Sequence, residues 1–218
     1  MSSFPGSPRV VKGGLVLIDP DTSAVIRVIV LQYNPDTLTR TLQVQGVGAQ
    51  GDRSEALRLK GPAVETIKVD AEIDATDQLE QADQNPDAVQ FGILPQLAAL
   101  ETIVYPSVAQ LQSNQSLAQA GTLEIIPMET PLVLFVWTRN RVLPVRVTDF
   151  SITEEAFDPA LNPIRAKVSL GLRVLSIDDL PSDHKGTGLF MAYLQQKETL
   201  RAKSPSGSLS GLGIEQIP

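Results

Sequence analysis

The residues able to perform chemistry are few. The single histidine, His184, follows three acidic residues, Asp178, Asp179 and Asp183. Imidazole and carboxylate groups can together bind a metal ion, but a structural zinc site needs further histidine or cysteine ligands. The chain contains no cysteine and no second histidine. We therefore expect His184 to be a solvated loop residue and predict no metal site.

Adjacent acidic residues raise the question of a glycosidase, which needs two carboxyl groups across a substrate cleft. Glu154 and Glu155 lie in a β-prone run, where neighbouring side chains point to opposite faces, so they cannot form that pair with each other. A serine nucleophile would have to use His184 as its base, and no Gly-x-Ser-x-Gly motif is present. The sequence predicts no catalytic residues and a protein that is not an enzyme.

A glycine-rich segment gives a third candidate. Gly46, Gly48 and Gly51 match the Gly-x-Gly-x-x-Gly pattern of dinucleotide-binding proteins, after a predicted strand. That motif must open a helix in a βαβ unit, and no such unit follows. We predict instead that residues 46–60, including Arg53, form a flexible loop that becomes ordered against a neighbouring subunit. No cofactor is predicted.

Composition limits the partners. The chain has 218 residues, of which 42% are hydrophobic, enough for the core of one main domain. Eighteen basic and 25 acidic residues give a net charge of −7, which disfavours nucleic acid and anionic membrane surfaces. The longest apolar run, residues 132–137, is too short to insert in a membrane, and we expect no signal peptide. The absence of cysteine fits assembly in a reducing cytoplasm.

Most of the elements that would position these residues are predicted to be strands. Residues 14–31 have turn-forming residues between two apolar runs, which indicates a hairpin. From residue 66 apolar and charged side chains alternate strictly, as in a half-buried antiparallel strand. The remaining predicted strands are residues 37–44, 132–138, 142–157 and 164–177, and the last has the longest alternation.

Two helices and three segments complete the predicted organisation. Apolar residues at spacings of three and four predict a helix after Pro95, and a C-terminal helix is expected at 188–202. Residues 107–121 are a loop or a weak helix. The fold class is therefore mainly β, of the α+β type: an antiparallel β-barrel or sandwich with one packed helix and a C-terminal helix. A flexible N-terminus (1–13) precedes the β-barrel domain (14–203), and a mobile tail (204–218) follows it.

Two Asn-Pro corners recur between predicted strands. Asn34-Pro35 and Asn162-Pro163 combine a residue that tolerates turn geometry with one that lacks an N–H, so they end one strand and direct the next. We interpret both as scaffolding rather than ligand sites. Long alternating strands between such corners also suit a barrel completed by a copy of itself. Five residues are expected in the core or at a subunit interface: Tyr33, Trp137, Phe157, Val168 and Leu170.

Four runs in the same order carry a resemblance to a known family. They are LQYNPDTLTRTLQ, GPAVETIKVDAEIDATDQLE, GILPQLAALETIVYP and PLVLFVWTRNRVLPVRVTDFSITEEAFDPALNPIRAKVSLGLRVL. Together they resemble the tube-type (tube-initiator) baseplate protein of contractile injection systems, which is related to phage-tail-like baseplate proteins with a LysM domain. The resemblance covers roughly residues 15–200. No LysM-like segment follows, so peptidoglycan binding is not carried over.

This resemblance implies a fold and a set of partners. Family members resemble the tube subunit, a small β-barrel with a flanking helix, and six copies form a ring between the spike and the inner tube. The implied partners are the chain itself in a hexameric ring, the spike protein, inner tube subunits and other baseplate proteins. The implied location is a particle assembled in the cytoplasm. The alternatives are another tube or cap position in the same particle, or a carbohydrate- or cell-wall-binding module.

Overall fold

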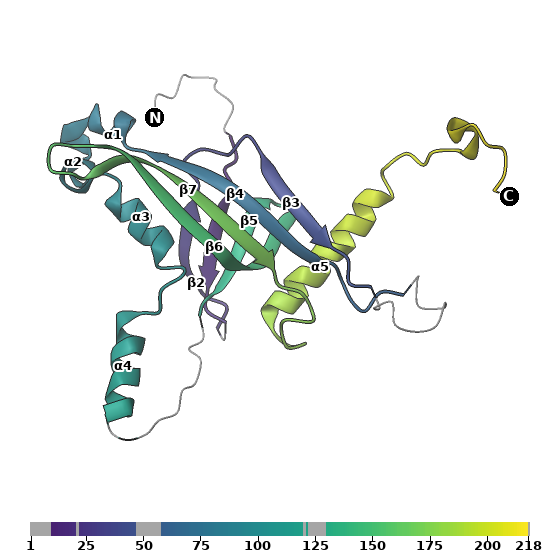
Figure 1. Ribbon diagram of the computed structural model, residues 1–218, viewed down its shortest axis with the longest axis horizontal. Coiled ribbons are helices and arrows are strands. Elements are labelled where there is room, and N and C mark those ends of the chain that lie inside the picture. The colour runs from purple at the N-terminus through teal and green to yellow at the C-terminus, as the bar shows by residue number, and fades with distance from the viewer. Residues whose placement is uncertain (1–9, 21, 47–57, 120, 122–129, 218) are drawn as a thin grey trace.

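The computed structural model describes residues 10–20, 22–46, 58–119, 121 and 130–217, and within them one seven-stranded antiparallel sheet organises the chain (Figure 1). The strand order is β2-β1-β5-β6-β7-β4-β3. The strands are β1 (Gly14–Ile18), β2 (Val25–Val30), β3 (Leu38–Gln43), β4 (Val64–Asp74), β5 (Leu132–Thr138), β6 (Arg141–Phe157) and β7 (Pro163–Val174).

The centre of the sheet follows directly from the alternation in the sequence. Val69 of β4 lies opposite Leu170 of β7, and Ala71 lies opposite Val168. All four side chains are buried, while the residues between them face outward. One face of β4 and β7 therefore carries the core, because strand side chains alternate between the two faces.

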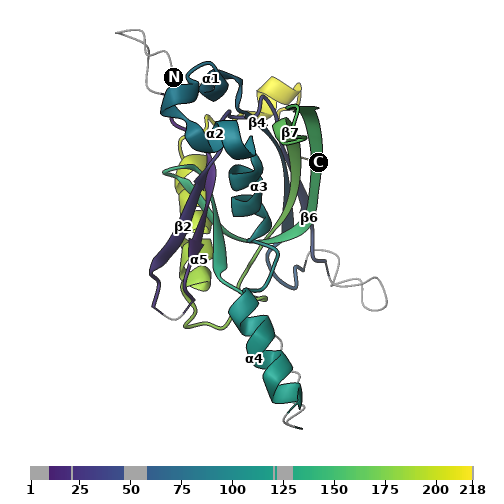
Figure 2. The ribbon, with the colours of Figure 1, turned by 90° about the vertical axis from the view of Figure 1, so that its left-hand side faces the viewer.

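The helices lie at the margins of the sheet. At one end are α1 (Thr76–Leu79), a 3₁₀ turn η2 (Ala82–Gln84) and α2 (Pro86–Phe91), whose helical character the sequence did not predict. The predicted helices are α3 (Leu94–Glu101) and α5 (Lys185–Arg201). The unassigned segment forms α4 (Val108–Gln119), which has no buried residue and projects from the body, and η3 (Leu209–Leu212) lies near the C-terminus (Figures 1 and 2).

The sheet is open, with β2 and β3 as its two edges. It curves so that α3 lies between β2 on one side and β4 and β7 on the other (Figure 2). Leu97 and Leu100 of α3 are buried in the same core cluster as the sheet residues, and α5 adds Phe190 and Tyr193. The predicted mainly β, α+β class is confirmed. The sheet does not close into a barrel, and α3 lies between β2 and the last residues of β4.

Candidate assembly interface

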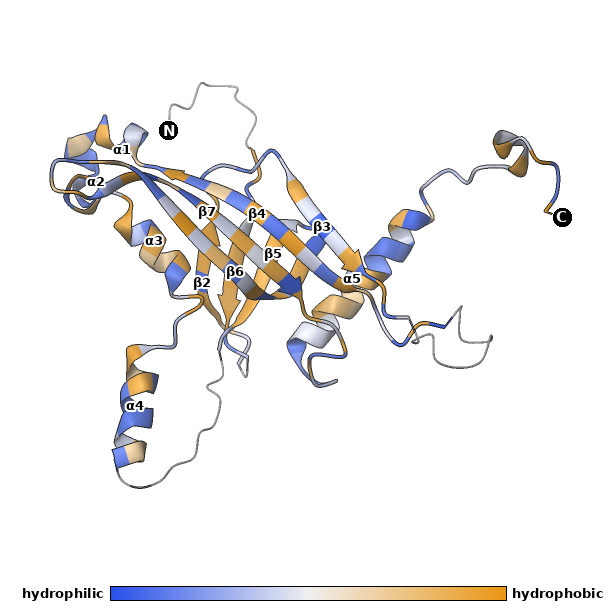
Figure 3. Cartoon of the chain, viewed as in Figure 1, coloured by the Kyte–Doolittle hydropathy of each residue, from blue (hydrophilic) through white to orange (hydrophobic). Residues whose placement is uncertain are grey.

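The edge strand β2 has one exposed apolar face, which carries Val25, Val28 and Val30, while Arg27 and Ile29 lie on the face of the core. Its sequence is VIRVIV, and four of its side chains, Val25, Ile26, Val28 and Val30, are between 55% and 62% exposed. The strand is orange over most of its length when coloured by hydropathy (Figure 3). Within the described residues β2 pairs only with β1, so its outer backbone groups have no strand partner. An apolar unpaired edge is a template for pairing with another chain.

A small cavity adjoins this edge. It has a volume of about 150 Å³ and lies between β2, the last residues of β4 and one face of α3. Gln96 of α3 lines it, and the side-chain oxygen Oε1 of Gln96 is buried without a hydrogen-bond partner in the described structure. A buried acceptor without a donor is unfavourable by about 1–3 kcal/mol.

The other edge strand, β3, has a different character. Its sequence, LTRTLQ, places polar or charged side chains at four of its six positions, and it pairs only with β4 among the described strands. Leu42 is its exposed apolar residue, at 50%. Polar side chains on an edge discourage non-specific pairing. β3 and β2 are nevertheless both six residues long.

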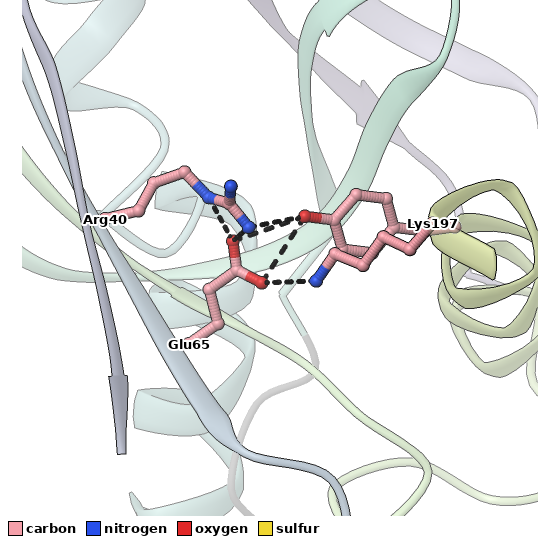
Figure 4. Close-up of polar contacts among 4 residues, drawn as sticks. Arg40, Glu65 and Lys197 are labelled. Atoms are coloured by element: carbon pink, nitrogen blue, oxygen red, sulfur yellow. Dashed lines mark hydrogen bonds and ion pairs between the residues drawn. The ribbon is translucent and has the colours of Figure 1, made fainter. Parts of the chain in front are cut away.

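A buried polar cluster fastens β3 and β4 to α5 (Figure 4). Glu65 of β4 is 3% exposed, and its Oε1 lies 2.6 Å from both Nε and Nη2 of Arg40. Its Oε2 lies 3.3 Å from Nζ of Lys197, and Tyr193 accepts a hydrogen bond of 2.8 Å from Arg40. The ammonium of Lys197 also lies 4.1 Å from the centre of the Tyr193 ring.

We did not identify Glu65 as a buried residue from the sequence, although the alternation pattern of β4 indicates it. The residue occupies the same face of β4 as Ile67 and Val69, so the alternation places a carboxylate among core residues. Removing a carboxylate from water is costly unless it is paired and hydrogen-bonded. A glutamate on a core-facing register therefore required cationic partners. The sequence could not identify Lys197 as one of them, because it lies 132 residues away.

The first Asn-Pro corner secures the N-terminal segment. The side chain of Asn34 accepts a hydrogen bond from the N–H of Gly13 and donates one to the carbonyl of Val11, both at 2.9 Å. Gln32 does the same for Asp74, at 2.6 and 2.9 Å. The side-chain amides of Asn34 and Gln32 thus make the pair of backbone hydrogen bonds that a neighbouring strand would otherwise make. The corner, including Pro35, borders a depression of about 560 Å³ on the outer face of β4, β6 and β7.

The second corner joins the sheet to α2 and α3. Asp158 accepts hydrogen bonds from the side chain and the N–H of Asn162, each at 2.8 Å, and these hold the pKa of Asp158 below its ordinary value. The carbonyl of Pro163 accepts from Ile93 at 2.9 Å. Gly92 has φ +58°, and a Cβ there would lie 2.2 Å from the same carbonyl oxygen, so only glycine fits.

The other predicted residues lie in several places. Val168 and Leu170 are in the core, Trp137 is half-buried and stacked on Phe135, and Tyr33 and Phe157 are about half exposed. Gly46 forms an isolated bridge with Leu59 at the base of the predicted assembly loop. The rest of that loop's named residues, Gly48, Gly51 and Arg53, lie outside the described residues.

Local structural roles account for the groups considered for catalysis. His184 is the N-cap of α5, where its Nδ1 accepts a hydrogen bond of 3.0 Å from the N–H of Gly186. Glu155 pairs with Arg165 and Lys167 across to β7. No group of three potential metal ligands occurs among the described residues. In the same part of the chain, no helix combines the length and hydropathy needed to cross a membrane.

Comparison with known proteins gives no family. No protein-family model and no curated protein matches the chain. A solved tail of an empty gene transfer agent particle with C6 symmetry contains a chain that is 13% identical, with a TM-score of 0.28. The virion of a native gene transfer agent particle contains one that is 10% identical, with a TM-score of 0.25. Each alignment covers 74% of this chain and 90% of the other. Similarity at this level carries no functional argument.

Proposed function

We propose that this chain is a non-enzymatic structural component of a phage-tail-like contractile injection particle. Its role is to form a ring that adapts the spike and baseplate to the inner tube and initiates tube assembly. The observation that carries this proposal is the β2 edge, which exposes four large apolar side chains and a backbone edge that pairs with no described strand. The resemblance of the four sequence runs supplies the kind of particle.

Ring closure uses the two unlike edges of the sheet. β2 of one copy pairs with β3 of the next, and the equal length of the two strands allows all six residues of each to take part. Because the paired surfaces differ, the contact is heterologous, and a heterologous contact closes into a ring when its rotation is a simple fraction of a turn. Six copies are the number that the family resemblance implies.

Initiation is geometric in this proposal. A completed ring presents its projecting elements to the next layer, and α4 is suited to this role because none of its residues is buried against the body. Forming the first layer of a polymer is slow when it depends on chance encounters of free subunits. A preformed ring removes that step, so tubes start only on a finished baseplate.

Assembly of the purified full chain tests the proposal. We expect sedimentation velocity to show reversible association, and electron microscopy to show rings that become more complete with the spike and inner tube proteins. A chain that stays monomeric alone and in that mixture would contradict it. Sedimentation with insoluble peptidoglycan tests the alternative, a cell-wall-binding module, for which retention of the monomer on the pellet would be the expected result.

A further inference from the structure

A second cavity lies at one end of the molecule, away from the β2 edge. It has a volume of about 380 Å³ and lies between β3, the β5–β6 turn and α5. Three cationic side chains line it: Arg40 of β3, Arg141 at the start of β6 and Lys197 of α5. The carboxylate of Glu65 is shared by Arg40 and Lys197. The cavity therefore has an excess of positive charge in a chain whose net charge is −7.

Two groups in this cavity have unused hydrogen-bonding capacity. The guanidinium of Arg141 makes no hydrogen bond or ion pair with any described residue. The side-chain oxygen Oε1 of Gln196 is buried and also has no partner there. Arg141 needs an acceptor, and Gln196 needs a donor. A peptide that carries a carboxylate supplies both: its carboxylate accepts from Arg141, and its backbone N–H donates to Gln196.

Acidic residues of this chain are concentrated in one part of the sequence. Residues 69–138 contain ten acidic residues and no lysine or arginine. Four of these, Asp77, Glu80, Asp83 and Asp87, lie on the segment from α1 to α2, which we call the acidic cap (residues 76–91). All four are exposed, and none forms a salt bridge in the described structure.

The acidic cap and the cationic cavity lie at opposite ends of the longest strand. Arg141 is the first residue of β6, and Phe157, the last, adjoins the corner that contacts α2. Figure 1 shows α1 and α2 at one end of the sheet, with β3 and α5 at the other. The two surfaces of one copy therefore cannot meet each other, but those of two copies in a head-to-tail arrangement can.

We propose that the cationic cavity binds a carboxylate of the acidic cap of a second copy of this chain. Arg141 and Lys197 hold the carboxylate, and Gln196 accepts a hydrogen bond from the backbone that carries it. This inference rests on the proposed self-assembly. Its contact does not involve β2, so a substitution on β2 weakens the ring contact without changing the cavity or the acidic cap. Charge complementarity of this kind fixes the direction and register of docking.

The experiment uses full-length chains in the Val28→Lys background, where pairing through β2 is weakened. Sedimentation velocity at low salt measures the remaining association of three proteins: the background itself, Arg141→Glu, and the double variant Asp83→Lys with Asp87→Lys. We expect each charge variant alone to associate at least about tenfold more weakly. An equimolar mixture of the two should recover association, because the acidic cap of the Arg141→Glu chain meets the unchanged cavity of the double variant and the reversed cap meets the Arg141→Glu cavity. Raising the salt concentration should weaken it.

Arg139→Glu is the matched control, because Arg139 lies exposed in the same β5–β6 turn but does not line the cavity. It should associate as the background does. Equal association of the Arg141→Glu variant and the background would overturn the proposal. Loss in both charge variants without recovery in the mixture would overturn the second copy as occupant. Failure of the ring proposal shows differently, as an unchanged ring in the Val28→Lys variant.

Discussion

The two edge strands of the sheet differ in how well they are protected against pairing with another chain. β3 is polar and is fastened to α5 through Arg40 and Glu65, so it has a fixed position before any partner arrives. Among the described strands β2 pairs only with β1, and it exposes Val25, Val28 and Val30 on one face. A protein that works as a monomer usually protects both edges with charges, prolines or bulges. Here only one edge is protected.

In the proposed ring, this difference makes β2 the edge that drives association and β3 the edge that sets how the strands align. The apolar edge gains free energy by leaving water, at about 25 cal/mol per Å² of apolar surface buried. In the proposed ring the polar edge adds little of that energy, and its fixed backbone sets the register of pairing. If both edges were apolar, pairing of like edges would compete with ring closure. A protected edge and an exposed edge together favour the heterologous contact.

Removing the carboxylate that fastens β3 has the largest expected effect. Glu65→Gln leaves Arg40 and Lys197 without their counter-charge, and breaking such a buried contact costs about 2–3 kcal/mol, allowing for the partial exposure of both cations. Urea unfolding should show this loss. Glu72→Gln is the matched control, because Glu72 lies on the same strand but faces outward. Equal unfolding midpoints for the two variants would contradict a stabilising role for the cluster.

A charge on the apolar edge should affect assembly rather than folding. Val28→Lys places an ammonium where β2 would meet a neighbour, and we expect association to weaken at least about tenfold, or 1.4 kcal/mol. The stability of the monomer should change by less than about 0.5 kcal/mol, because Val28 is 57% exposed. Sedimentation velocity and thermal unfolding separate these effects. Rings of normal abundance would show that β2 is not the contact.

The matching change on β3 distinguishes unlike from like pairing. Leu42→Lys should weaken association by a similar factor, about tenfold, if β3 receives β2. Each variant then keeps one good edge, so an equimolar mixture of Val28→Lys and Leu42→Lys should form dimers and no rings. Native mass spectrometry can count the copies. If the Leu42→Lys chain assembles normally, β2 pairs with itself or with another protein.

The smallest expected effect is on stability at acidic pH and comes from Asp74, the last residue of β4. The carboxylate of Asp74 accepts hydrogen bonds from the hydroxyl and the N–H of Thr76, and these lower its pKa below the ordinary 3.8. A lowered folded-state pKa means that the contribution is present above pH 3.8 and is lost as the pH falls below it. Asp74→Ala should therefore cost about 1 kcal/mol at pH 6, and less at pH 3.

Thermal unfolding of the Asp74→Ala variant and the wild-type chain across this range measures the difference. Asp70→Ala is the control, since Asp70 is exposed on the same strand. A gap between the Asp74→Ala variant and the wild type that stays constant from pH 6 to pH 3 would show that the carboxylate does not contribute through its charge.

The sequence by itself determined the strands of the sheet and the mainly β class. Alternation of apolar and polar residues is a local property, and it assigns faces to β4 and β7 without knowledge of their neighbours. It also contains two further signals: Glu65 on a core-facing register, and the absence of basic residues from 69 to 138. The short helices between Thr76 and Phe91 were missed because four to six residues show too little periodicity.

Only the tertiary structure decided which surfaces stay unsatisfied. Whether VIRVIV is a central strand or an edge depends on the strand order, and an apolar run reads the same in both positions. Whether the sheet closes depends on pairing between its two edge strands, which is a contact between distant segments. The cationic cavity likewise gathers Arg40, Arg141 and Lys197 from three separate elements. Such features arise from long-range packing, whereas sequence periodicity reports only on neighbours along the chain.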